Sequence, residues 1–269
     1  MTFPPEGITD VNLLRIYWLK KFKLPAKQVL MTQNETPVAG EKPRSNNTRY
    51  FYGIALIFAY LTGVVIFSTP EILEHWGFSR VSGQSLVINR LLIWLGLAGL
   101  WFYARKVEKQ KLILHDEIEY PARFYFPAIL ILLVIITTGS SLISLLTNLV
   151  FHQSGSMRLN QLILIMKGNF LLLFFVSATA GITEEIIFRG YIQTRIEKIF
   201  KGPWPAIIIT SLLFAVLHAS YGTLLQVMVP LFIGLVFSWF YWKYRSIRIL
   251  IIVHFIYDLA TLLILVNKL

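Results

Sequence analysis

The chain has 269 residues, of which 56% are hydrophobic and only 14% are charged. This composition excludes an ordinary soluble domain, which must cover its surface with polar groups, and it favours a polytopic membrane protein. The formal charge of +11 would suit a nucleic-acid binder, but the basic residues lie in short clusters between long apolar runs, so we expect membrane lipid and no nucleic acid as a partner. Because cysteine is absent, disulfides, a cysteine nucleophile and a thiolate metal site are excluded.

Residues 1–49 are polar and basic, and we expect them to form a cytoplasmic N-terminal arm. Between Ile8 and Trp18 the apolar residues have helical spacing, and Lys20, Lys21 and Lys23 follow. This pattern fits a helix lying on an anionic membrane surface, and a partly ordered arm fits it equally well.

Residues 50–269 are predicted to form an all-α, polytopic transmembrane helix bundle. A span needs about twenty apolar residues, and seven stretches are candidates, one of them uncertain: 50–68, 85–104, 124–148, 170–194, 204–218, 223–242 and 249–266. The stretch 159–182 is also apolar and is interrupted by Lys167, so an eighth helix could precede the fourth span. We therefore expect seven to eight helices.

The distribution of Lys and Arg predicts the orientation of the bundle. Basic residues crowd the N-terminal arm and the segments 105–123, 195–201 and 243–248, whereas the segments near 71–80 and 152–158 are poorer in them. The basic segments should face the cytoplasm. We expect a multi-pass integral membrane protein, and the compact length with short loops favours a bacterial cell membrane.

Two adjacent glutamates, Glu184 and Glu185, lie inside an apolar run. A charged side chain in the bilayer costs free energy unless it is paired or hydrated, so its presence indicates a functional site. On a helix Glu185 and Arg189 share a face and can pair. Glu184 points about 100° away from Glu185, so it stays free to face a cavity and to act as a general base.

Three further ionisable residues lie inside predicted spans, namely His218 in one span and His254 and Asp258, one helical turn apart, in the last. Taken singly, such a histidine is more commonly a packing residue than a catalyst. Counting about 1.5 Å per helical residue, however, these three and Glu184 lie roughly 9 to 20 Å below the same basic face. This convergence predicts one polar site within the bundle.

The motifs Glu184-Glu185-x-x-Phe188-Arg189-Gly190, Phe214-x-x-x-His218 and His254-x-x-x-Asp258, in this order, resemble the CPBP family of intramembrane proteases. That family includes the type II CAAX prenyl endopeptidases and bacterial relatives tied to bacteriocin maturation or self-immunity. The resemblance covers residues 177–262 and implies an endopeptidase acting on a prenylated or membrane-associated peptide.

The resemblance also implies a role for each motif residue. Glu184 and His218 would activate the attacking water, and Glu185 and Arg189 would hold the site in shape. His254 with Asp258 would stabilise the oxyanion. Phe188 and Phe214, which stand inside the motifs, are the candidate substrate-binding residues.

Position 258 departs from many family members, which carry asparagine there. An ionised aspartate cannot donate a hydrogen bond, so Asp258 is either protonated, or orients His254, or binds a metal. In the last case Glu184, His218, His254 and Asp258 could form a zinc site with an open water position. We favour the glutamate mechanism without a cofactor, because no His-Glu-x-x-His zinc helix is present.

Proteolysis inside a bilayer requires water at the scissile bond, so we expect a central catalytic cavity, open to the cytoplasm where the basic loops lie. The main alternative is a non-catalytic immunity or scaffold protein of the same fold, but such a protein has no need to bury these groups together. A proton-coupled carrier is a third reading, and the chain shows no convincing internal repeat to support it.

Overall fold

The computed structural model describes residues 46–68, 82–151 and 155–268. The predicted surface helix and nearly all of the basic arm lie outside these residues. Within them the chain is helical and contains no strand, which confirms the all-α prediction. The helices, in chain order, are α3 (Asn47–Phe67), α5 (Gly83–Tyr103), α6 (Ala122–Phe151), α7 (Met157–Met166), α8 (Phe170–Glu185), α9 (Thr194–Phe200), α10 (Pro203–His218), α11 (Leu225–Tyr244) and α12 (Ile247–Lys268).

Three short turns extend these helices. The π-helical turn η1 (Ala104–Glu108) prolongs α5, the π-helical turn η2 (Ile186–Gln193) joins α8 to α9, and the 3-10 turn η3 (Ala219–Tyr221) follows α10. With these extensions, 7 helices in the described part of the chain are long and apolar enough to cross a membrane. The apolar stretch 159–182 divides into α7 and the first part of α8. Because α7 has only 10 residues, about 15 Å of helix, it is too short to be an eighth span.

The helices begin where the sequence offers a cap. The Ser82 side chain accepts the backbone N–H of Ser85, and the Ser85 hydroxyl accepts that of Ser82, so α5 starts with a capping box. Asn169 accepts the N–H of Leu172 at the start of α8, at 3.0 Å. Pro203 opens α10, at the helix position where a missing N–H costs nothing.

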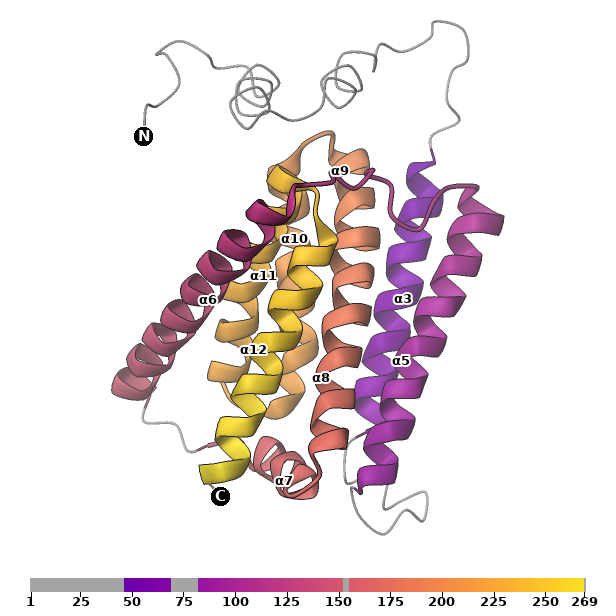
Figure 1. Ribbon diagram of the computed structural model, residues 1–269. Helices are drawn as coiled ribbons and strands as arrows, with labels where there is room; N and C mark the ends of the chain where they lie inside the picture. The colour runs from indigo at the N-terminus through magenta and orange to yellow at the C-terminus, as the bar shows by residue number, and fades with distance from the viewer. Residues whose placement is uncertain (1–45, 69–81, 152–154, 269) are drawn as a thin grey trace, which may run out of the picture. The chain divides into compact units, whose positions relative to one another are not determined.

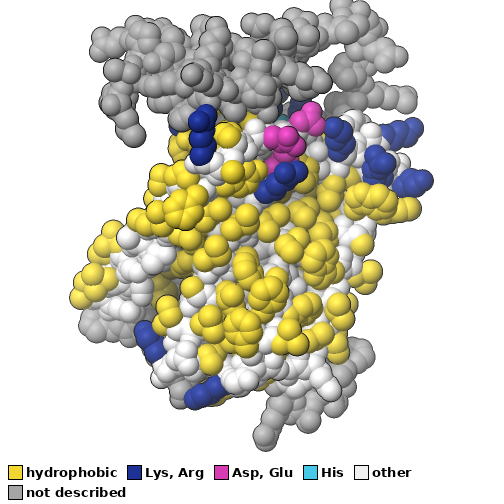
Figure 2. Space-filling model, in the orientation of Figure 1, with side chains coloured by type: hydrophobic (Ala, Val, Ile, Leu, Met, Phe, Trp, Pro, Cys, Tyr) yellow, Lys and Arg dark blue, Asp and Glu magenta, His cyan; other side chains and the backbone are white. Residues whose placement is uncertain are grey.

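The helix α8 lies inside the bundle (Figure 1). It contacts α5 on one side and α12 on the other, while α3 packs on α5, α10 packs on α11, and α6 packs on α11 and α12. This placement surrounds the two glutamates of α8 with other helices. Figure 2 shows hydrophobic side chains over the middle of the face in view, and Lys and Arg gathered mostly toward one end.

We call that end the basic end; it comprises residues 104–123, 198–203 and 243–248. We call the opposite end the far end; its described part comprises Ser68, Ser82, 155–169 and 219–224. These two names fix directions along the bundle, and every span runs from one end to the other.

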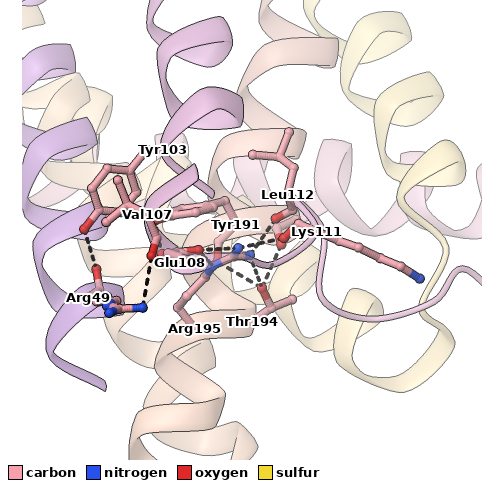
Figure 3. A network of polar contacts seen from close by, with 10 residues as sticks. Arg49, Tyr103, Val107, Glu108, Lys111, Leu112, Tyr191, Thr194 and Arg195 are labelled. Atoms are coloured by element: carbon pink, nitrogen blue, oxygen red, sulfur yellow. Dashed lines mark hydrogen bonds and ion pairs between the residues drawn. The ribbon is translucent and has the colours of Figure 1, made fainter. Parts of the chain in front are cut away.

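At the basic end, a buried ion pair joins η1 to α9 (Figure 3). Arg195 Nη2 lies 2.7 Å from Glu108 Oε2, and both side chains are fully buried. The Tyr191 hydroxyl donates to the other oxygen of Glu108 at 2.6 Å. Arg195 also donates to the carbonyl oxygens of Lys111 and Leu112. These contacts hold the segment after α5 against η2 and α9.

The same segment also caps α12, which carries His254. The Glu117 carboxylate accepts the backbone N–H of Ile247, at 2.9 and 3.1 Å from its two oxygens. This N–H is one of the unpaired donors at the helix start. Burial raises the pKa of Glu117, although the backbone N–H groups of Ile247 and Arg248 and the charge of Arg248 act in the opposite direction.

The raised pKa of Glu117 predicts how stability depends on pH. A carboxyl whose pKa is higher in the folded than in the unfolded protein binds its proton more tightly when folded, so its contribution falls as pH rises through these values. We expect the wild type to gain stability, relative to Glu117→Gln, as pH is lowered from neutrality through the acidic range. Thermal unfolding of both proteins in detergent across this pH range measures the difference. A difference that stays constant with pH would contradict the prediction.

Candidate active site

The two adjacent glutamates end α8 and have different environments. The Glu185 side chain is fully buried, whereas that of Glu184 is 19% exposed. The helix then widens into η2, and such π-helical turns frequently occur at functional sites. The structure therefore closes off one carboxylate and leaves the other accessible.

Glu185 is the acceptor for two other motif residues. Arg189 Nη1 donates to Glu185 Oε1 at 2.8 Å, which is the i,i+4 pair that the spacing predicted. His254 Nδ1 lies 2.7 Å from the same oxygen. Because an ionised carboxylate only accepts, Nδ1 must carry the proton. Glu185 therefore fixes both the orientation and the tautomer of His254.

The other ring nitrogen of His254 faces the two remaining carboxylates. His254 Nε2 lies 3.9 Å from Glu184 Oε2 and 3.5 Å from Asp258 Oδ2. Both distances are longer than a strong hydrogen bond. The ring thus connects the closed carboxylate of Glu185 with the accessible one of Glu184.

Arg189 is fully buried, and aromatic rings surround it. Its guanidinium carbon lies 4.8 Å from the ring centroid of Phe214 and 5.4 Å from that of Phe237. Cation–π attraction of this kind stabilises a desolvated cation. The Phe237 ring also lies 5.9 Å from that of His254. These rings hold the cluster of Glu185, Arg189 and His254 from the α10 and α11 side.

His218 is the last residue of α10. Its Nδ1 lies 2.8 Å from the carbonyl oxygen of Phe214. A carbonyl oxygen only accepts, so Nδ1 carries the proton and Nε2 of a neutral ring keeps its lone pair. His218 is thus arranged to accept a proton or a hydrogen bond at Nε2.

Glu184 and His218 share one cavity of about 150 Å³. Phe188 and Phe214 also line it, with ring centroids 5.0 Å apart. The remaining lining comes mostly from α3, α5 and the far end and includes Ser68, Ser85, Asn89, Arg90, Arg158, Ser220 and Tyr221.

The cavity extends toward the far end, and not toward the basic end as the sequence analysis expected. The reason is the short α10, whose 16 residues finish at His218 and turn directly into η3. Counting residues from the basic end gave the depth of His218 from that side only. The opening to the cytoplasm stays a prediction, because it depends on which end of the bundle faces that side of the membrane.

The eight predicted site residues fall into two connected groups. Glu184, His218, Phe188 and Phe214 line the cavity. Glu185, Arg189, His254 and Asp258 form the polar cluster behind it. The sequence analysis overlooked Arg90, although a charge inside the predicted span 85–104 is the same signal that singled out Glu184.

The polar cluster is held by a close approach of two helices. A side-chain carbon at Gly181 would lie 3.0 Å from the backbone nitrogen of Phe255 and 3.1 Å from the carbonyl oxygen of Ile251. The backbones of α8 and α12 therefore touch here, and only glycine fits. One helical turn further along α8, Glu184 and Glu185 meet His254 of α12.

The described residues contain no group of three or more His, Asp or Glu side chains arranged to hold a metal ion. In the cluster, His254 uses Nδ1 for Glu185 and so offers only Nε2 as a ligand. The side chains as they stand do not form a closed zinc site.

In the described part of the chain, seven helices are long and apolar enough to span a membrane, and inside them lie an accessible glutamate and two histidines, groups that indicate a functional site at such a depth. Residues 166–260 match the family model of the type II CAAX prenyl endopeptidases, described as Rce1-like. This part of the chain is thus similar to the Rce1-like domain of a protease family, which confirms the resemblance drawn from the motifs. The match includes all eight predicted site residues. No curated protein and no solved structure matches the chain.

Proposed function

We propose that this protein is an intramembrane endopeptidase that hydrolyses a peptide bond of a prenylated or membrane-associated peptide. One observation carries the proposal: Glu184 faces a cavity shared with His218, while its neighbour Glu185 is sealed behind it by Arg189 and His254. A general base needs access to water, and a supporting carboxylate does not.

The proposed reaction begins with a water molecule in the cavity. Glu184 accepts a proton from this water while His218 Nε2 orients it, and the hydroxide oxygen attacks the peptide carbonyl carbon. The resulting tetrahedral intermediate collapses as the C–N bond breaks, and Glu184 returns the proton to the leaving nitrogen. Glu184 is then ionised again, and the protein has returned to its starting protonation state.

We assign His254 to the oxyanion of this intermediate. Its Nδ1–H is taken by Glu185, so a donor toward the oxyanion must be an N–H at Nε2, and the ring must be the imidazolium. Asp258 lies on the Nε2 side at 3.5 Å. Because its ionised carboxylate cannot donate, we assign it to orienting this ring.

The substrate's route follows from the orientation that we propose. Basic loops favour the cytoplasmic side, so the basic end and the N-terminus would face the cytoplasm, in a bacterial cell membrane. The cavity extends toward the far end. A membrane-bound peptide would then enter from the opposite side of the membrane or laterally from the lipid.

The test is cleavage of a fluorogenic peptide by the purified protein in detergent, with prenylated and unprenylated versions, each with and without a zinc chelator. We expect cleavage that survives chelation. Loss on chelation with recovery on adding zinc would replace the glutamate mechanism by metal catalysis through Glu184, His218, His254 and Asp258. Absence of cleavage together with peptide binding would favour the non-catalytic scaffold.

A further inference from the structure

We propose that Arg90 forms a carboxylate-binding subsite in the cavity and thereby selects peptides with a carboxylate near the scissile bond. This inference rests on the proposed function, and it names the substrate chemistry for the same site. Arg90 lies in α5 and lines the cavity together with Glu184 and His218. It belongs to none of the three sequence motifs.

Arg90 stands seven residues into α5, about 10 Å along the helix from Gly83. A charged side chain within a span is costly unless it is paired or hydrated. No carboxylate of the described residues forms an ion pair with it. Its Nε is buried and has no hydrogen-bond partner.

Other arginines inside the bundle have protein partners. Arg189 and Arg195 each pair with a buried glutamate. Arg158, in the same cavity as Arg90, donates to the carbonyl oxygens of Val65, Ser68 and Ser220. Arg90 differs from them because the described protein supplies no acceptor for it, so its guanidinium remains available for an acceptor that a ligand brings.

A carboxylate is the group that best fits an available guanidinium, because its two oxygens match the planar fork of N–H donors. The cavity, at about 150 Å³, is smaller than the roughly 300–1,000 Å³ of pockets that enclose a drug-sized ligand. Such a space accepts the end of a peptide more readily than a chain passing through. The free C-terminal carboxylate is therefore the first candidate, and an acidic side chain close to the end is the second source of the same chemistry.

The charges in the cavity also set the direction of the bound peptide. A carboxylate is repelled by Glu184 and attracted by Arg90, while Arg158, the other cation of the lining, already donates to three carbonyl oxygens. The anionic group should therefore lie on the α5 side. The carbonyl to be attacked then lies toward Glu184 and His218. Arg90 would thus both select the substrate and orient it.

The test measures binding first, so that it does not depend on turnover. Three fluorescent peptides are compared. Two have the same sequence and end in a free carboxylate or in an amide, and the third has a glutamate added at its end, which is also amidated. They are bound to purified Glu184→Gln protein in detergent, alone and combined with Arg90→Gln. Arg105→Gln, which removes an exposed arginine of η1 at the basic end, is the matched control.

We expect the free-carboxylate peptide to bind about 10- to 100-fold more tightly than the amide, the range expected for a hydrogen-bonded charged pair. Arg90→Gln should reduce this ratio to about one, and Arg105→Gln should leave it unchanged. Preference for the glutamate peptide over both others would assign the subsite to an acidic side chain. Equal binding of all three peptides, or a ratio that survives Arg90→Gln, would overturn the proposal.

Cleavage assays with the wild type separate this inference from the function on which it rests. A carboxylate preference in binding without any cleavage would refute the protease and keep the subsite. Cleavage of the acid and the amide with equal efficiency would keep the protease and refute the subsite. If Arg90 only balanced the charge of Glu184, its loss would weaken all three peptides alike.

Discussion

Replacing Glu184 by glutamine should lower peptide cleavage by about 10³-fold or more, because the amide cannot accept the proton of the attacking water. The substitution keeps the size of the side chain and removes a charge from a partly exposed position, so the protein should still fold. The measurement is kcat/KM for a fluorogenic peptide, with thermal unfolding as the check on folding.

Glu119→Gln is the matched control for this substitution. It makes the same chemical change at an exposed residue between η1 and α6, far along the chain from the cavity, and should leave cleavage near that of the wild type. Full activity in purified Glu184→Gln would remove Glu184 from the mechanism.

Replacing Arg189 by methionine should cost about 3–5 kcal/mol of stability, because it leaves the buried and charged Glu185 carboxylate with only His254 as a partner. Both side chains are fully buried and lie 2.8 Å apart, so solvent cannot compensate for the lost cation. Unfolding temperature and the yield of monodisperse protein in detergent measure the effect.

The double variant Glu185→Gln/Arg189→Met tests whether the uncompensated charge is the cause. Removing both charges together should recover much of the lost stability, since a neutral buried pair carries no such penalty. A double variant as unstable as Arg189→Met would show that packing against Phe214 and Phe237 matters more than the charge. A wild-type unfolding temperature in Arg189→Met itself would contradict the prediction.

The sequence predicted the spans well, because length and hydropathy alone define a helix that can cross a bilayer. It also predicted that Glu185 and Arg189 pair, since residues four apart on a helix meet by geometry. Their spacing survives the widening of the helix at η2, where Arg189 still reaches Glu185 at 2.8 Å.

The sequence alone could not predict features that depend on packing between distant segments. The bond from His254 to Glu185 joins residues 69 positions apart, and no local pattern reveals it. The direction of the cavity depends on where α10 ends relative to α3, α5 and η3, and depth along one helix does not contain this information. The short α7 was ambiguous for a similar reason, because an apolar run of 24 residues reads as one helix until a cap such as Asn169 divides it.

The contact of α8 with α12 at Gly181 has a consequence for motion. Two backbones in contact have no layer of side chains that could rearrange between them, so these helices cannot slide or separate without losing the contact. The glutamates of α8 and His254 of α12 therefore move as one rigid body. Any widening that admits a substrate must come from the opposite wall, where α3, α5 and α7 contribute the lining. A peptide can thus be admitted by movement of these helices while Glu184, Glu185 and His254 keep their spacing.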